Sequence, residues 1–266
     1  MVSVILPFVK IDNNLIFILE SYIANGQGVE LVLIRDGPLV ESSPTLLNTF
    51  ENLLGRCRIN ALNVVFCELP QNNGVGTARN TGIEKVTNPF FLFLDSDDFL
   101  FFDRLAQIDF TIFSDHPFVK FRSFQLREGS WTKARLARLA YSSFVVDTRW
   151  IKEQMVGISS FMCFCNSWAF NTHFVKTNLI YFDSNLPSHE DLAFVLNCFQ
   201  RAKVQRVLEC DQFVGVVQLK KSSRSGAVTS IHRNLKILQR HFGLWTGTGL
   251  LCLHLVAAIN KRFVKA

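Results

Sequence analysis

The 266-residue chain is long enough for one large domain or a domain with a sizeable extension, and its 48% hydrophobic content, with 26 Phe, indicates a large core, a membrane-facing surface, or both. Its seven cysteines form no Cys-x-x-Cys pair, which disfavours a zinc site or a disulfide framework and predicts free thiols in a reducing cytosol. The formal net charge of +6 is uneven, because residues 201–266 hold 12 Lys and Arg against two acidic residues, a balance that favours phosphates, nucleic acid or anionic lipid as partners.

The first element predicted along the chain is a strand rather than a leader segment. "MVSVILPFVK" has no positively charged start, and its apolar run is too short for a secretory signal. Further apolar runs bounded by turn residues predict strands at 2–8, 29–37, 61–69 and 89–98. Helical spacing between these runs predicts helices over 13–25 and 76–86. This alternation predicts a mostly parallel sheet that is covered on both faces.

Acidic residues follow two of these strands, at Asp36 and in "FLDSDD", which contains Asp95, Asp97 and Asp98. Ligands of open α/β sheets bind beyond the carboxyl ends of the strands, so these side chains mark a candidate site. Clustered carboxylates suit magnesium or manganese. Taken alone, "DSDD" fits equally well a solvated turn in which Asp98 caps a helix over "FLFFDRL".

Two other stretches contain residues suited to binding or catalysis. In "NNGVGTARNTG" (72–82), three glycines allow close backbone approach, and Arg79 supplies a fork for a phosphate or a base. The stretch lacks the ending of a P-loop, and read alone it fits a glycine-rich turn before a surface arginine. "SHEDLAFVLNCFQRA" (188–202) predicts a helix with Ser188 as its N-cap. Its acids, Glu190 and Asp191, fit either helix capping or a general base that faces a pocket.

The later part of the chain is less regular. "WTKARLARLAYSSF" (131–144) predicts a basic helix and "QFVGVVQL" (212–219) a late strand, followed by the polar "KKSSRS" at 220–225. "TSIHRNLKILQRHF" predicts an amphipathic helix, and residues 241–260 contain no Lys, Arg, Asp or Glu. Three readings stay open for this segment: a helix lying on a membrane, a core or oligomer helix, and a membrane span. The predicted division is a domain over 1–225 and a helical extension over 226–266.

Taken in order, these motifs resemble the family 2 glycosyltransferases, inverting enzymes of the glycosyltransferase A fold. The resemblance covers roughly residues 2 to 225. It is carried by "SVILP", "LIRDGP", "GVGTARNTG", "FLDSDD" and "SHEDLAF". The chain departs from the family pattern at Arg35, which stands in place of the first Asp of a pair, and at Phe8-Val9 in place of Tyr-Asn. The implied fold is a single α/β domain of this type with a basic amphipathic C-terminal helical extension.

The resemblance implies a role for each matching residue. Pro7 and Asp36 would lie beside the nucleotide base, Arg79 near the base or diphosphate, and Asp95 near the ribose and the metal. Asp97 would ligate a divalent metal, Mn or Mg, with Asp98 as the alternative. Asp191 would deprotonate the acceptor hydroxyl, and Glu190 would position the acceptor. Lys221 belongs to a basic loop that would close over the diphosphate.

The implied activity is inverting transfer of a sugar from a nucleotide-sugar donor, a UDP-sugar, to a hydroxyl of a glycan or lipid-linked oligosaccharide in polysaccharide, lipopolysaccharide or capsule biosynthesis. The expected location is the cytoplasm, peripheral to the inner face of the membrane, with oligomers allowed and nucleic acid not a partner. One alternative is a sugar-1-phosphate nucleotidyltransferase, but "PFVKIDNN" follows the first strand where that class has a Gly-rich loop with Arg and Lys. Another is a non-catalytic nucleotide or phosphate-binding module, which leaves the acidic cluster unexplained.

Overall fold

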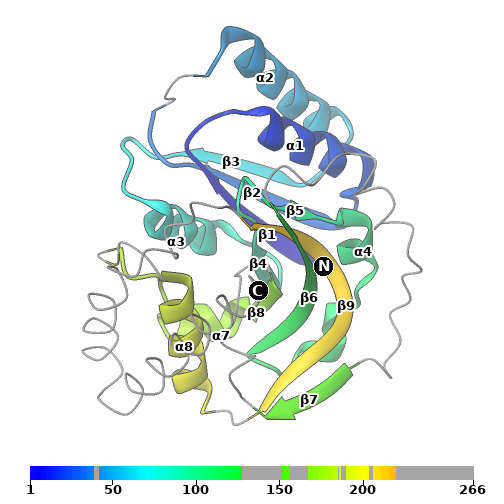
Figure 1. Cartoon of the computed structure of the whole chain (residues 1–266), viewed down its shortest axis with the longest axis vertical. Helices are drawn as coiled ribbons and strands as arrows, with labels where there is room; N and C mark the ends of the chain where they lie inside the picture. Colours follow the sequence, from blue (N-terminus) through cyan, green and yellow to red (C-terminus); the bar gives the residue numbers. More distant parts are fainter. Residues whose placement is uncertain are drawn as a thin grey trace, which may run out of the picture.

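In the residues that the structure describes, nine strands pair in one sheet. The structure, a computed structural model, describes residues 1–38, 42–127, 151–155, 167–184, 186, 190–203 and 206–219. Within these ranges the strand order is β3-β2-β1-β4-β8-β6-β9-β5, and β7 pairs with β9 (Figure 1).

Half of the sheet is parallel and is built from the first hundred residues. Its strands are β1 (Val2–Phe8), β2 (Val29–Arg35), β3 (Val64–Glu68) and β4 (Phe90–Phe93). β1 lies between β2 and β4, and β3 lies outside β2. Because these strands run in the same direction, their carboxyl ends meet at one edge of the sheet.

The other half is mixed. It contains β5 (Phe99–Leu100), β6 (Phe118–Arg127), β7 (Ile151–Met155), β8 (Trp168–Asn171) and β9 (Arg206–Leu219). β8 is antiparallel to both β4 and β6, so it joins the two halves. β9 runs parallel to β6 and antiparallel to β5 and β7.

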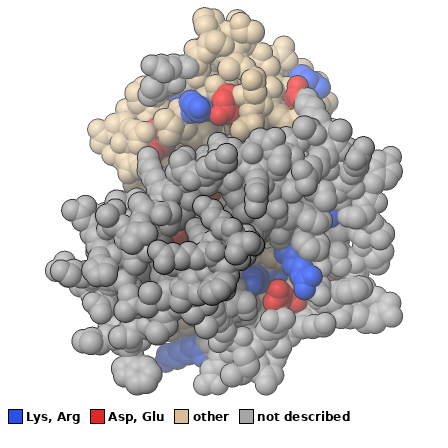
Figure 2. All heavy atoms as spheres, viewed as in Figure 1, with Lys and Arg blue, Asp and Glu red and all other residues tan. Residues whose placement is uncertain are grey.

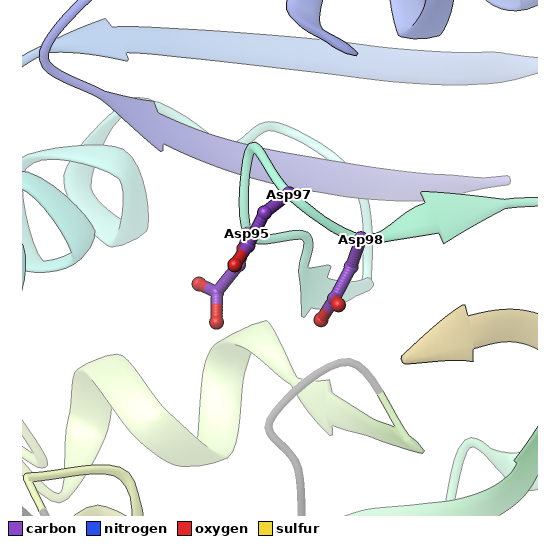
Figure 3. A group of neighbouring side chains, drawn as sticks. All are labelled: Asp95, Asp97 and Asp98. Atoms are coloured by element: carbon purple, nitrogen blue, oxygen red, sulfur yellow. The ribbon is translucent and has the colours of Figure 1, made fainter. Parts of the chain in front are cut away.

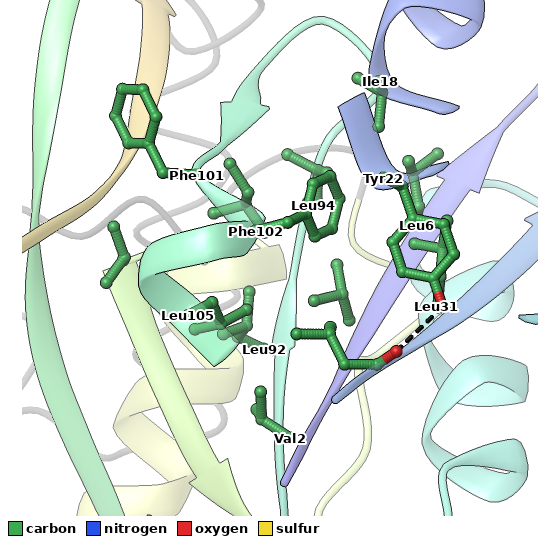
Figure 4. Packing of buried hydrophobic residues seen from close by; sticks show 14 of the residues in the cluster. Val2, Leu6, Ile18, Tyr22, Leu31, Leu92, Leu94, Phe101, Phe102 and Leu105 are labelled. Carbon is green, nitrogen blue, oxygen red and sulfur yellow. Dashed lines mark hydrogen bonds between the residues drawn. The ribbon is translucent and has the colours of Figure 1, made fainter. Parts of the chain in front are cut away.

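Helices cover both faces of the sheet. They are α1 (Asn13–Asn25), α2 (Pro44–Ile59), α3 (Val75–Lys85), α4 (Phe102–Gln107), α7 (Thr172–Thr177) and α8 (Glu190–Ala202), with a short 3-10 turn, η1 (Phe110–Phe113). Alternate residues of β1 bury on opposite faces. Val4 and Leu6 join the cluster under α1, α2 and α4, whereas Ile5 joins the cluster under α3, α7 and α8. In the first cluster Tyr22 donates its hydroxyl hydrogen bond to the Val29 carbonyl at 2.9 Å (Figure 4).

The predicted α/β architecture is confirmed, with differences at the element boundaries. β1 and α1 have the predicted bounds, and α1 begins where the Asp12 carboxylate accepts hydrogen bonds from the Asn14 and Leu15 amides. Helix α2 was not predicted, although Ser43 caps it and Pro44 occupies its first turn. The predicted helix over 131–144, the cap Ser188 and the extension over 226–266 lie outside the described residues.

Four of the seven cysteines lie in the described residues. Among the described cysteines, Cys57, Cys67 and Cys198 are free thiols, as expected. Burial raises the pKa of the Cys198 thiol well above its ordinary value, which keeps this α8 side chain neutral in the core.

In the part of the chain that the structure describes, no helix combines the length and hydropathy needed to cross a bilayer.

Gly82 sets how closely α3 approaches β1. A Cβ atom at this position would lie 2.2 Å from the Ile5 Cγ2 atom, whereas a Cβ at Gly55 in α2 would meet nothing within 4 Å. Gly82→Ala is therefore expected to lower the free energy of unfolding by about 1–3 kcal/mol. Gly55→Ala, the matched control, is expected to raise it by about 0.5–1 kcal/mol. Urea unfolding measures both, and an unchanged midpoint for Gly82→Ala would contradict the packing argument.

Candidate active site

The carboxyl ends of β1 and β2 are held together by a buried aspartate. Asp36, 2% exposed, donates its amide hydrogen bond to the Phe8 carbonyl at 2.8 Å. Its carboxylate accepts a hydrogen bond from the Asn73 amide at 2.9 Å. Gly37, with φ of +92°, lets the turn pass so close to Asn72 that a side chain would clash with that backbone. Asp36 thus links the end of β2 to the loop that precedes α3.

Three carboxylates gather on the loop that joins β4 to β5 (Figure 3). One oxygen atom from each of Asp95, Asp97 and Asp98 lies within 4.8 Å of the others. The Asp98 amide donates a hydrogen bond to the Asp95 carbonyl at 2.9 Å. This bond closes a tight turn directly after β4. The helix-cap reading of Asp98 is wrong, because β5 follows it and α4 begins only at Phe102. The reading as a solvated turn also fails at Asp98, which is 6% exposed.

The donor set of this loop fits a divalent cation. Carboxylate oxygens are the hard ligands that magnesium and manganese prefer, and three like charges at this spacing repel unless a cation offsets them. Asp97 and Asp95, with Asp98 beside them, are the residues that would hold it.

Arg79 links the acidic loop to α8. Its Nη2 atom lies 2.7 Å from Asp95 Oδ1, and its Nη1 atom lies 3.0 Å from Glu190 Oε1. The Arg79 side chain is 5% exposed, against 43% for Asp95 and 18% for Glu190. Its guanidinium also lies over the rings of Phe93 and Phe182, at 5.8 and 5.2 Å from their centroids. The arginine of "GTARNTG" is therefore not a surface side chain.

The neighbour of Arg79 fixes the segment that leads to α8. Asn80 donates a side-chain hydrogen bond to the Phe182 carbonyl at 2.9 Å and accepts one from the Phe182 amide at 2.8 Å. The Phe182 ring stacks on Phe194 of α8, with centroids 4.3 Å apart and planes 6° apart. These contacts place the first turn of α8, with Glu190 and Asp191, beside α3.

The structure brings most of the predicted site residues to one edge of the sheet. Pro7 is buried in β1 opposite Ile34, and Asp36, Arg79, Asp95 and Asp97 follow or flank the same strand ends. Glu190 reaches this group through Arg79, and Asp191 follows it in α8. Lys221 lies outside the described residues. The individual roles of all these residues stay predictions.

Sequence reasoning missed Asn80 and Phe182. Asn80 was visible as the polar residue directly after Arg79, but its partner lies 102 positions away along the chain. On the face shown in Figure 2, some of the visible charged side chains of the described residues lie with both signs side by side, and others stand alone.

Comparisons with known proteins support the fold and point to one family. The family model described as "Glycosyl transferase family 2" matches residues 3–174. An uncharacterized glycosyltransferase of Haemophilus influenzae is 26% identical over 209 residues, 75% of this chain and 71% of that protein. A teichoic acid poly(glycerol phosphate) polymerase of Staphylococcus epidermidis is 26% identical over 176 residues, 64% of this chain and only 22% of the polymerase.

A solved structure shows the same fold. The crystal structure of S. aureus TarS 1-349 in complex with UDP-GlcNAc superposes with a TM-score of 0.63 at 20% sequence identity. The match covers 90% of this chain and 64% of the TarS chain. The family model covers well over half of the sequence, and the fold is the α/β fold that the resemblance to this family implied. The chain belongs to glycosyl transferase family 2.

Proposed function

We propose that this protein is an inverting glycosyltransferase that moves a sugar from a nucleotide-sugar donor to an acceptor hydroxyl. One observation carries the proposal: an acidic cluster at the end of β4 is joined through a buried arginine to an acidic helix start in α8. The cluster suits a diphosphate with its metal, and the helix supplies a carboxylate for an incoming alcohol. Family membership supports the same activity.

The proposed reaction is a single displacement at the anomeric carbon. The Asp191 carboxylate accepts the proton of the acceptor hydroxyl as its oxygen forms the new bond to that carbon. The bond between the anomeric carbon and the diphosphate oxygen breaks on the opposite side, with both its electrons leaving on the nucleoside diphosphate. Attack opposite the leaving group inverts the configuration.

The other residues bind and orient in this proposal. Asp36 and Pro7 flank the nucleotide base, and Asp95 lies toward the ribose. A divalent cation bound by Asp97 and Asp95 would offset the negative charge that develops on the leaving diphosphate. Lys221, in the basic stretch 220–225, completes the diphosphate site in the proposal.

The proposed donor is a UDP-sugar and the proposed acceptor a glycan or lipid-linked oligosaccharide of a surface polysaccharide. The solved TarS complex contains UDP-GlcNAc, and the Staphylococcus relative is named for teichoic acid. The basic balance of residues 201–266 supports a cytoplasmic enzyme that lies peripherally on an anionic membrane face.

A donor panel tests the activity. We expect release of the nucleoside diphosphate from one or a few UDP-sugars in the presence of Mn²⁺, and faster release when anionic vesicles bearing lipid-linked glycan are added. Mass spectrometry of the acceptor and NMR of the new linkage check transfer and inversion. Release of pyrophosphate from a nucleoside triphosphate and a sugar 1-phosphate would instead indicate a nucleotidyltransferase. Binding of nucleotide sugars without turnover of any of them would contradict the proposal.

A further inference from the structure

We propose that Arg79 is a positioning residue that joins the two halves of the site by holding Asp95 and Glu190 at the same time. The inference rests on the proposed function for its kinetic test. It concerns how the acidic loop after β4 and the first turn of α8, which are far apart in the sequence, are held at a working distance.

The contacts of Arg79 account for this role. The two terminal nitrogens of one guanidinium each bind a carboxylate from a different element, at 2.7 Å to Asp95 and 3.0 Å to Glu190. A planar guanidinium presents these donors in a fixed fork, so the positions of both carboxylates are tied to each other. A lysine ammonium in the same place offers a single charged centre without this geometry.

Burial makes the link rigid. The Arg79 side chain is 5% exposed, and its guanidinium packs over Phe182 and Phe93. Phe182 is in turn held by Asn80, the next residue of α3, and by stacking on Phe194 of α8. Charge-assisted hydrogen bonds are stronger than neutral ones, and the Arg79 end of both bonds is shielded from water, so Arg79 acts as a strut between the loop and the helix.

The strut assigns a specific task to Glu190. Its carboxylate is committed to Arg79, and the next residue in α8 is Asp191, the proposed base. Glu190 therefore fixes the position of Asp191 relative to Asp95 instead of contacting the acceptor. A displacement of about 1 Å in such a geometry costs on the order of a hundredfold in rate.

Glu190→Gln is the main test, because it removes the charge and retains the size of a side chain on the first turn of the helix. We expect kcat for transfer to fall by about 10- to 100-fold, while the donor KM, the acceptor KM and the Kd for UDP with Mn²⁺ change by less than about twofold. Glu84→Gln is the matched control, since Glu84 lies on α3 as Arg79 does and accepts a hydrogen bond from the Tyr181 hydroxyl in the segment before α8. It is expected to leave kcat within about twofold. A rise in acceptor KM at constant kcat would overturn the inference.

A double-mutant cycle tests whether the two residues act as a unit. Arg79→Lys and Glu190→Gln together are expected to lower kcat no more than about twofold beyond the worse single variant. Losses that multiply would mean independent roles and would overturn the inference. Glu190→Asp, which keeps the charge on a shorter side chain, is expected to lose less kcat than Glu190→Gln, and an equal or larger loss contradicts the strut.

One measurement does not depend on activity. Hydrogen exchange in peptides that cover α8 (Glu190–Ala202) is expected to quicken by about tenfold in both Glu190→Gln and Arg79→Lys, and to stay unchanged in Glu84→Gln. Unchanged exchange in the first two variants would overturn the strut even in an active enzyme. Absence of transfer by the wild-type protein with every donor would instead count against the proposed function, and the exchange result would still decide the strut.

Discussion

Replacing Asp191 with Asn is expected to abolish sugar transfer while leaving nucleotide binding nearly intact. An amide is almost the same size as a carboxylate but does not accept a proton, so the acceptor hydroxyl keeps its proton during attack. Removal of a general base costs about 10²- to 10⁴-fold in rate. Single-turnover transfer with saturating donor measures the loss, and calorimetry with UDP and Mn²⁺ measures binding.

The matched control for this variant is Asp103→Asn. Asp103 lies in the first turn of α4, as Asp191 lies in the first turn of α8, and both are partly buried. α4 packs in the cluster on the other face of the sheet, so this variant is expected to transfer sugar within about twofold of the wild-type rate. Near-normal turnover of Asp191→Asn would remove Asp191 from the role of base. A parallel loss of UDP affinity would show that the residue serves binding.

Replacing Asp97 with Ala is expected to weaken UDP binding in Mn²⁺ by about 100-fold or more, equivalent to about 2.7 kcal/mol. With EDTA present, the wild type and the variant are expected to bind UDP equally weakly, because the carboxylate acts through the cation. Calorimetry in the two buffers gives this difference without any turnover. Asp115→Ala, at an exposed acid in the turn before β6, is the control and is expected to behave as the wild type.

The acidic loop also gives this variant a stability readout. Three carboxylates with oxygens within 4.8 Å repel each other, so removal of one in metal-free buffer is expected to raise Tm or leave it unchanged. Loss of UDP affinity without loss of Tm would exclude misfolding as its cause. Asp98→Ala decides between the two candidate ligands: a stronger effect at Asp98 than at Asp97 would make the buried aspartate the main ligand. If Asp97→Ala bound UDP as tightly as the wild type in Mn²⁺, the predicted metal role of Asp97 would be ruled out.

The parallel half of the fold was predictable because the hydrophobic pattern of each strand or helix lies within one short segment of the sequence. β1 and α1 have the predicted bounds, since an apolar run and a capped 3.6-residue period each fit within one short segment. The predicted strand over 89–98 was too long, because the turn from Asp95 to Asp98 ends pairing after Phe93 even though the amide of Leu94 still binds Ile5. The rule that ligands bind beyond strand ends was enough to predict at which edge of the sheet the acidic residues gather.

The side-chain contacts within the candidate site were not predictable from the sequence. Arg79 lies 16 positions from Asp95 and 111 positions from Glu190 in the sequence. Both contacts form only because of the way α3 and α8 pack in the fold. Gly82 was predicted to allow a close approach, but nothing in "NNGVGTARNTG" shows that the approaching group is Ile5 of β1. Whether Asp98 caps a helix or is buried in a turn depended on a two-residue strand, β5, that is too short to leave a periodic pattern.

The paired hydrogen bonds between Asn80 and Phe182 have a consequence for how the fold tolerates changes in chain length. They fasten two sides of the candidate site directly, α3 and the segment that leads to α8, although more than a hundred positions of chain separate Asn80 from Phe182. Alignment of the two sides is therefore decoupled from the length of the intervening polypeptide. Changes in length within the loops of that stretch, outside its strands and the acidic cluster, are therefore expected to leave the position of Phe182 on α3 unchanged.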